Sequence, residues 1–337
     1  MNGIAARFGV DTAKNVFAIY GVDKFDKEVV SKVVSRKKVL AYFANISPVI
    51  IGIEACGGSH YWARELSNLG HEVRIISSQF VVPYRHKGKN DINDAQAICE
   101  AIGRPGMHFV AHKSEDQQSI LMAHRIRSLS IGRRTALINQ IHGYLHEFGI
   151  VVSKGRHKLK RDLHEVLASD KLPDIVIELL HGLLIGLIRE EENIEHLDSM
   201  IESWAREDER TLRLLELEGV GPLTASAVVA TVGDPSMFKN GRQMAAWLGL
   251  VPSQHSSGGK SRLGSITKRG DRYLRMLLIH GARTVLLKSS RGTAKHQDWI
   301  ESLRLRRPDN VVAVAYAAKQ ARMMWAIMMG KQQLTAS

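Results

Sequence analysis

The sequence of 337 residues is 44% hydrophobic and 24% charged, which is typical of a soluble protein with two or three domains. Lysine and arginine outnumber aspartate and glutamate by 47 to 34, a net charge of +13 that favours nucleic acid as a partner. No apolar signal core is present at the N-terminus, and the longest strongly apolar stretch, 179–188, is far shorter than the roughly 20 residues that span a bilayer. We therefore expect a cytoplasmic, nucleoid-associated protein with no membrane partner.

The two cysteines, Cys56 and Cys99, argue against a structural zinc site. They form no CxxC motif and have no histidine at the spacing of a zinc site. We expect both to be small buried thiols in a reducing cytosol.

The first segment, 1–112, predicts an α/β domain. Short apolar or alternating runs predict strands at 7–22 (two strands), 28–36, 49–56 and 71–78. The run at 49–56 is continuously apolar, which indicates a strand buried on both faces. Helical spacing predicts helices at 37–46, 59–70 and 91–103. Three strands followed by alternating helices and strands predict a mixed sheet covered by helices.

The middle segment, 113–210, is predicted to be helical. One long helix is expected from residue 114, and a second follows a basic stretch at 154–161. The second helix has apolar residues at three- and four-residue steps: Leu180, Leu183, Leu184, Leu187, Ile194, Leu197 and Ile201. This pattern fits equally well an intramolecular helical hairpin and a coiled-coil seam between two chains.

Four carboxylates fall at positions where they can converge. Asp11 interrupts the first strand pattern, Glu54 ends the buried strand, and Asp91 and Asp94 are three residues apart on a predicted helix. Buried carboxylates are costly unless cations compensate them, and Mg²⁺ prefers oxygen ligands. We therefore predict that the four side chains bind magnesium, as two ions suited to phosphoryl transfer. Taken singly, Asp94 is also typical of a surface charge and Asp91 of a helix N-cap.

The last segment, 211–337, is predicted to be mostly helical. Its motif LEGVGP at 217–222 is typical of a helix-hairpin-helix, a common nucleic-acid-binding element. There, Gly219 and Gly221 would allow backbone N–H groups to approach a phosphate closely. A tight interhelical turn without nucleic acid gives the same pattern.

A basic, glycine-rich loop is expected at 253–270. From 253 to 297 the chain has ten lysines or arginines and one acid, Asp271, a balance that fits phosphate contacts. The cations predicted to bind nucleic acid are Lys260, Arg262, Lys268, Arg269 and Arg272. Ser256 and Ser257 lie in the same loop, and a serine hydroxyl becomes a nucleophile when a base or a metal activates it. By themselves, these serines also fit a polar, solvated loop.

Together these segments resemble the DEDD-type insertion-sequence transposases, the Piv-like recombinase family. The matching motifs are GVDTAKNVF around Asp11, IGIEACGG around Glu54, and NDINDAQAICEA with Asp91 and Asp94. The last third adds GLVPSQHSSGGKSRLGSITKRGD. The resemblance covers nearly the whole chain and is weakest between 151 and 210.

The resemblance implies a ribonuclease H-like (RuvC-like) domain at 1–112, a coiled-coil region at 113–210 and a transposase domain at 211–337. It implies that the four carboxylates hold Mg²⁺ and that a serine attacks DNA. The family's serine aligns best with Ser257, beside Ser256. The family also implies donor and target DNA paired to a structured noncoding RNA. Its oligomers, dimers or tetramers, bring one subunit's carboxylates to another subunit's serine.

Three other functions fit parts of the pattern. GVDTAKN is similar to the first phosphate loop of sugar kinases and actin-like ATPases, but a second Asp-Gly phosphate loop and a glycine-rich adenosine site are absent from the sequence. A RuvC-like junction-resolving nuclease would use the carboxylates alone and leave the serine loop unexplained. A non-catalytic nucleic-acid-binding protein would use only the helix-hairpin-helix.

Overall fold

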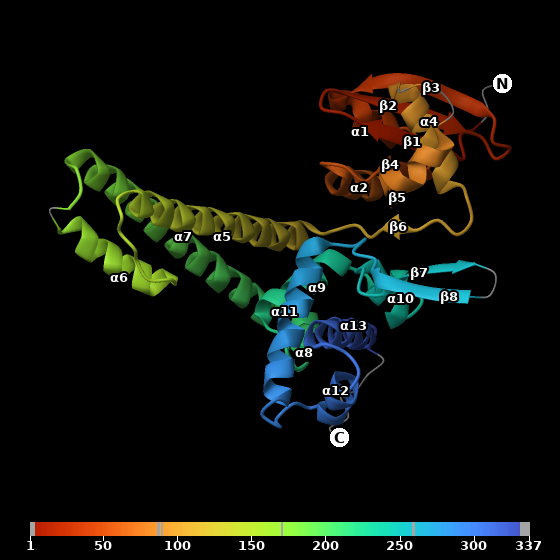
Figure 1. Ribbon diagram of the computed structural model, residues 1–337. Coiled ribbons are helices and arrows are strands. Elements are labelled where there is room, and N and C mark those ends of the chain that lie inside the picture. Colours follow the sequence, from red (N-terminus) through yellow and green to blue (C-terminus); the bar gives the residue numbers. More distant parts are fainter. Residues whose placement is uncertain (1–3, 86–87, 89, 170, 258–259, 331–337) are drawn as a thin grey trace. The chain divides into compact units, whose positions relative to one another are not determined.

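The computed structural model describes residues 4–85, 88, 90–169, 171–257 and 260–330. The chain folds into two compact units: Met1–Asp116 with Val232–Met237, and Gln117–Thr231 with Phe238–Ser337. The first unit is a mixed α/β structure and the second is mainly helical, as the sequence predicts (Figure 1). The division into three domains at residues 112 and 210 stays a prediction.

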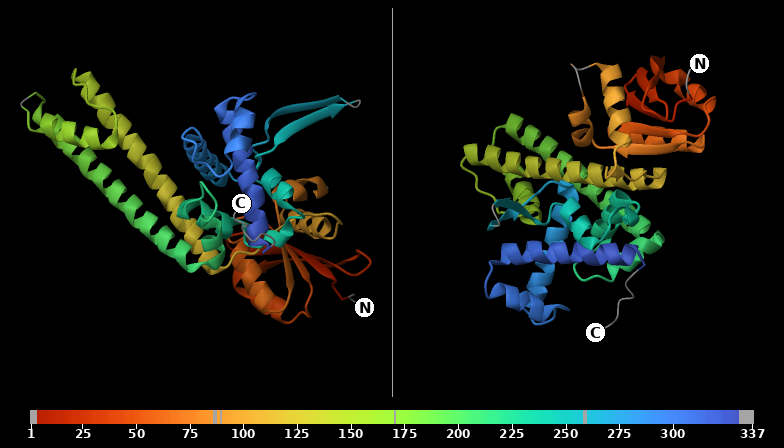
Figure 2. Two further views of the ribbon diagram at one scale, coloured as in Figure 1. Left: turned by 90° about the horizontal axis from the view of Figure 1, so that it is seen from below. Right: turned by 90° about the vertical axis from the view of Figure 1, so that its right-hand side faces the viewer.

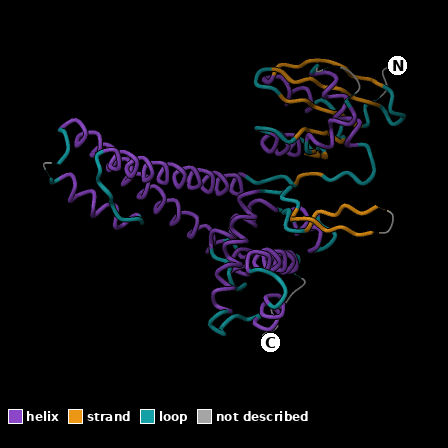
Figure 3. Tube along the Cα trace, viewed as in Figure 1, coloured by secondary structure: helices purple, strands orange, loops and turns teal. Residues whose placement is uncertain are grey.

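The first unit is built on a six-stranded sheet with the strand order β3-β2-β1-β4-β5-β6 (Figure 3). Strands β1 to β3 pair antiparallel, β4 and β5 extend the sheet in parallel with β1, and β6 pairs antiparallel with β5. The strands are β1 (Arg7–Thr12), β2 (Val16–Val22), β3 (Glu28–Ser35), β4 (Ile50–Glu54), β5 (Glu72–Ile76) and β6 (Phe109–Val110). The predicted mixed sheet is confirmed, and β6 is an additional edge strand.

Helices cover both faces of this sheet. Side chains alternate between the faces along each strand, so Phe8 and Val10 of β1 join the core with Phe43 and Trp62. This core lies under α1 (Val39–Ala44) and α2 (Ser59–Asn68), while α4 (Asp91–Ile102) covers the opposite face. The short elements are α3 (Ser78–Val81) and the 3-10 turns η1 (Arg36–Lys38), η2 (Val82–Tyr84) and η3 (Pro235–Met237).

Two glycines allow α4 to pack directly on the central strands. A Cβ added at Gly9 would lie 2.0 Å from the carbonyl oxygen of Ala95, and one at Gly52 would lie 2.7 Å from Ile102. No larger residue fits at these two positions without moving α4. The helix is therefore held close to β1 and β4, at the strand ends that carry the predicted carboxylates.

The second unit contains a long antiparallel helical hairpin. α5 (Glu115–Glu147) and α7 (Asp174–Glu207) run side by side in all views, and α6 (Arg156–Leu167) packs against them (Figures 1 and 2). The seven apolar positions predicted on the second helix are buried or partly buried, and Leu197 and Ile201 pack both on α5 and on Ala230. They thus form an intramolecular core. No helix in the described residues is long and apolar enough to cross a membrane.

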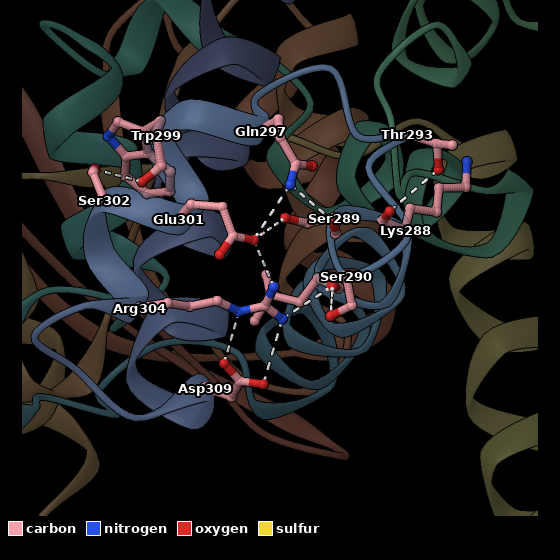
Figure 4. A network of polar contacts seen from close by, with 11 residues as sticks. Lys288, Ser289, Ser290, Thr293, Gln297, Trp299, Glu301, Ser302, Arg304 and Asp309 are labelled. Carbon is pink, nitrogen blue, oxygen red and sulfur yellow. Dashed lines mark hydrogen bonds and ion pairs between the residues drawn. The ribbon is translucent and has the colours of Figure 1, made fainter.

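The remaining helices form a compact bundle. They are α8 (Glu209–Leu215), α9 (Pro222–Val232), α10 (Gly241–Trp247), α11 (Arg272–Ser289), α12 (Gln297–Arg304) and α13 (Asp309–Met328). Arg304 links three of them, since its guanidinium donates to Asp309 Oδ1 at 2.9 Å and to the Leu286 carbonyl at 3.0 Å (Figure 4). Ser289 Oγ in turn donates to Glu301 at 2.8 Å.

The segment predicted as a basic loop is a β-hairpin instead. β7 (Pro252–Ser257) and β8 (Lys260–Ile266) pair antiparallel, with Ser257 opposite Lys260 in the last pair. The sequence contains the signal for this, because two glycines, Gly258 and Gly259, separate two short polar runs. The loop prediction for 253–270 is therefore wrong over most of its length.

Candidate functional site

The register of the sheet brings Asp11 and Glu54 together. β1 and β4 are parallel, and the last registered pair is Val10 with Ile53, so Asp11 and Glu54 follow one step later on neighbouring strands. Adjacent strands lie about 4.8 Å apart. Both carboxylates share the sheet face of Gly9 and Gly52, since each lies two residues further along its strand. This is the face that α4 covers.

The first turn of α4 supplies the other two carboxylates. Asn90 is the N-cap, where its side chain accepts from the Ile92 N–H at 3.0 Å, and Asp91 is the first helical residue. Asp91 is exposed, whereas Asp94 is buried, with a relative exposure of 6%. Asp91 is therefore not the N-cap, and Asp94 is not a surface charge.

The pKa of Asp11 reports the proximity of all four groups. Burial and, in that order of importance, the negative charges of Asp94, Asp91 and Glu54 together raise the pKa of Asp11 to about 6. Each of these carboxylates is thus close enough to disfavour ionisation of Asp11. The site has a surplus of negative charge.

The chemistry of this group fits a divalent cation, although the side chains are not arranged around one. Among the described residues, no group of three or more His, Cys, Asp or Glu side chains is positioned to hold a metal ion. Arg85 instead forms an ion pair with Asp94, at 2.5 Å. Four carboxylates supply the hard oxygen ligands that Mg²⁺ prefers, and such an ion would offset the mutual repulsion that contributes to the raised pKa of Asp11.

Two residues beside the carboxylates were not singled out from the sequence. Thr12, next to Asp11, has its Oγ1 3.1 Å from Cys56 Sγ in the turn after β4. Cys56 is exposed because β4 ends at Glu54, so the prediction that it is buried is wrong. Cys99 is buried as predicted, and burial raises its pKa to about 11. The Thr12–Cys56 contact joins the two segments that carry Asp11 and Glu54.

The predicted serine lies at the end of a β-strand. The backbone places Ser257 at the last paired position of β7, and Ser256 precedes it, opposite Ser261. The side chains of residues 255–261, among them that of Lys260, lie outside the described residues. The same holds for the whole of Gly258 and Gly259. Assignment of the nucleophile therefore stays a prediction.

Of the other predicted cations, Arg262 lies on β8, Lys268 and Arg269 follow that strand, and Arg272 begins α11. Arg262, Lys268, Arg269 and Arg272 are all exposed. No ion pair is formed by any of these four within the described part of the chain. Lys268 has a positive φ of 55°, and its N–H donates to the Gly249 carbonyl at 3.2 Å. Exposed cations without carboxylate partners are available to a polyanion.

The helix-hairpin-helix glycines have different surroundings. Gly219 has a φ of 80°, and a Cβ there would lie 2.7 Å from the Gly281 carbonyl oxygen of α11. The turn before α9 packs tightly against α11. This packing alone explains why residue 219 is a glycine, and no contact with nucleic acid is needed. A Cβ added at Gly221 would have no atom within 4 Å. Phosphate binding by these two residues stays a prediction.

Comparison with known proteins identifies the family to which this chain belongs. Residues 8–150 match a transposase model of the DEDD type, and residues 212–297 match the model described as "Transposase IS116/IS110/IS902 family". A "Probable family 20 transposase" of Pseudomonas aeruginosa is 48% identical over 96% of both chains. The "Transposase for insertion sequence element IS1328" of Yersinia enterocolitica is 39% identical over 95% of both.

A further relative agrees with these two. The "Transposase for insertion sequence element IS1111A" of Coxiella burnetii is 39% identical over 95% of this chain and 88% of its own length. The similarity covers nearly the whole chain and therefore includes both units. An ATPase of the sugar-kinase type is not supported by any of these matches. The chain belongs to the IS116/IS110/IS902 family of transposases, and it is a DNA transposase.

Proposed function

We propose that this protein is the transposase of a bacterial insertion sequence, which cuts and rejoins DNA through Ser257 with the help of Mg²⁺ on Asp11, Glu54, Asp91 and Asp94. The observation that carries the proposal is the sheet register, which places Asp11 beside Glu54 on neighbouring parallel strands, on the face that α4 with Asp91 and Asp94 covers. The strand order and the position of α4 support a ribonuclease H-like (RuvC-like) fold for the first unit. The names of the relatives from Yersinia and Coxiella support the insertion-sequence role.

In the proposed reaction, the Ser257 hydroxyl attacks a DNA phosphorus. A bond forms between Ser257 Oγ and phosphorus, the bond between phosphorus and one deoxyribose oxygen breaks, and the serine proton passes to solvent or to a neighbouring carboxylate. Bound Mg²⁺ would supply Lewis acidity at the phosphate oxygens. Lys260 and Arg262 would stabilise the negative charge that develops on the phosphate. The product is a phosphoserine link. The terminal hydroxyl of a second strand then attacks the phosphorus, the bond to Ser257 Oγ breaks, and the serine is released.

The partners follow from the same proposal. Donor and target DNA would bind the exposed cations Arg262, Lys268, Arg269 and Arg272, which have no carboxylate partner in the described residues. A structured noncoding RNA would select the DNA by base pairing. The protein would act as a dimer or a tetramer, in which the carboxylates of one subunit meet Ser257 of another. The net charge of +13 supports binding of several polyanions.

The test uses the full chain with DNA of the element, the RNA transcribed from the element and Mg²⁺. Denaturing electrophoresis should show a covalent protein–DNA band that Ser257→Ala abolishes and Ser256→Ala retains. Asp11→Asn should abolish the same band. If Ser257→Ala still cleaves strands, the protein acts instead as a junction-resolving nuclease that uses the carboxylates alone.

A further inference from the structure

Arg85 occupies a position at the carboxylate site that no sequence motif indicates. It follows η2, and its Nε lies 2.5 Å from Asp94 Oδ1. The Asp94 side chain is 9% exposed and that of Arg85 is 27% exposed. A cation from the segment before α4 therefore reaches the most buried of the four carboxylates.

Arg85 offsets part of the negative charge of this site. Within the described ranges, Asp94 is the one member of the group Asp11, Glu54, Asp91 and Asp94 with an ion-pair partner. One positive charge thus faces up to four negative charges.

The contact between Arg85 and Asp94 is an ion pair without a well-formed hydrogen bond. Arg85 Nε and Asp94 Oδ1 are both buried, and neither has a hydrogen-bond partner among the described residues. Charge-assisted pairs owe much of their strength to aligned hydrogen bonds, and a buried pair that lacks them recovers little of its desolvation cost. A doubly charged competitor can therefore displace Arg85 from Asp94.

We propose that Arg85 takes the place of the divalent cation at Asp94 in the metal-free protein and that cation binding releases its guanidinium to contact a DNA phosphate. This inference rests on the proposed function, since it needs Asp94 to be a metal ligand. After release, Arg85 has lost its carboxylate partner beside the place where the scissile phosphate binds. Its planar group of N–H donors suits phosphate oxygens. Arg85 thus positions DNA only when the site is loaded.

The first measurement is the affinity of the full-length protein for Mn²⁺ without nucleic acid, by titration calorimetry or by the electron paramagnetic resonance of free Mn²⁺. Arg85→Gln removes the competing charge and should bind Mn²⁺ about tenfold more tightly, the change that 1.4 kcal/mol produces. Arg104→Gln is the matched control, because Arg104 also pairs with an acid of α4, Glu100, but away from the site. Its affinity should equal that of the wild type.

The second measurement is DNA affinity with and without saturating Ca²⁺, by fluorescence anisotropy. Arg85→Gln should weaken DNA binding about fivefold or more with Ca²⁺ and leave it unchanged without Ca²⁺. Arg85→Lys should recover part of the loss, since a charge is retained. Thermal unfolding of each variant shows whether it is folded, and the Ca²⁺-free DNA affinity is a second internal check.

The outcomes separate this inference from the proposed function. Unchanged or weaker Mn²⁺ affinity in Arg85→Gln overturns the inference, as does equal loss of DNA binding with and without Ca²⁺. Asp94→Asn tests the function itself, because it should lower Mn²⁺ affinity at least tenfold. If Asp94→Asn binds Mn²⁺ like the wild type, the proposed metal site fails, whatever Arg85→Gln does.

Discussion

Gly9 of β1 lies in direct contact with the backbone of α4 at Ala95, where an added Cβ would be 2.0 Å from the carbonyl oxygen. Asp11 is two residues beyond Gly9 on the same face, and Asp94 directly precedes Ala95. The close approach of strand and helix at Gly9 therefore sets the separation of the two carboxylates. A side chain at Gly9 would change stability and site geometry together.

Gly9→Ala should destabilise the protein and weaken metal binding. The new methyl group must push α4 outward, which costs about 1–3 kcal/mol in a well-packed core. Urea unfolding measures the loss, and Mn²⁺ titration measures the effect on the site. Gly132→Ala is the control: Gly132 lies on α5 with open space around it, and this change should stabilise the helix by about 0.5–1 kcal/mol. Normal stability of Gly9→Ala would contradict the packing argument.

Magnesium should stabilise the wild type and not Asp11→Asn. A ligand that binds only the folded state adds about 1.4 kcal/mol at ten times its dissociation constant. Thermal unfolding with EDTA and with a series of Mg²⁺ concentrations should show this shift for the wild type alone. In EDTA, Asp11→Asn should be at least as stable as the wild type, because the substitution removes one of four mutually repelling carboxylates. Loss of stability in EDTA would indicate a structural role for Asp11.

His124 should make the second unit sensitive to acid. Its Nδ1 lies 3.0 Å from Tyr273 Oη and its Nε2 lies 3.0 Å from Ser226 Oγ. Burial and, to a lesser extent, the charge of nearby Arg127 lower the pKa of His124 to about 4. A histidine with a lowered folded-state pKa binds its proton mainly after unfolding. Its stabilising effect is complete above the ordinary pKa of 6.5 and is lost as pH falls towards 4.

Urea unfolding between pH 7.5 and pH 4 tests this dependence. The wild type should lose up to about 3 kcal/mol through His124 over this range. His124→Gln should be less stable at pH 7.5 but show a smaller loss on acidification. The exposed His280, on α11, offers a control, since His280→Gln should keep the wild-type dependence. An identical pH profile for His124→Gln would refute the argument.

The exposed cations near the hairpin should contribute to DNA affinity through counterion release. Arg262→Gln, Lys268→Gln and Arg272→Gln should each reduce the slope of log affinity against log salt by about one, if each residue neutralises one phosphate. Arg213→Gln is the control, because Arg213 is exposed but already paired with Glu209. Fluorescence anisotropy over a salt series gives the slopes. Equal slopes for all four variants would remove this surface from the DNA interface.

Most of the first unit could be predicted because its signals are local. The strand at 50–54 follows from a continuous apolar run, and Gly70, with a φ of 92°, closes α2 as a helix-ending glycine should. The order of Asp11, Glu54, Asp91 and Asp94 along the chain predicts a shared metal site, and that site stays a prediction. The parallel register of β1 and β4 places Asp11 beside Glu54, and α4 covers the face of the sheet that carries both.

The features that sequence did not reveal depend on distant partners. The hairpin at 252–266 has polar strands without a core face, so hydrophobic alternation was absent and only the Gly-Gly pair signalled it. The contact of Gly219 with Gly281 joins residues far apart in sequence, and a turn motif alone cannot predict it. No sequence motif indicates Arg85, because its pairing with Asp94 depends on how α4 packs on the sheet.

The helical hairpin of the second unit has a further consequence, which concerns the distance that it spans. α5 and α7 run for 33 and 34 residues without interruption, which at 1.5 Å per residue is a length of about 50 Å. Two packed helices of this length form a stiff spacer. The two ends of the hairpin are thus separated by a distance equal to the length of about fifteen base pairs of B-form DNA, at 3.4 Å per base pair. Two nucleic-acid contacts at opposite ends of the hairpin would therefore be separated by this length.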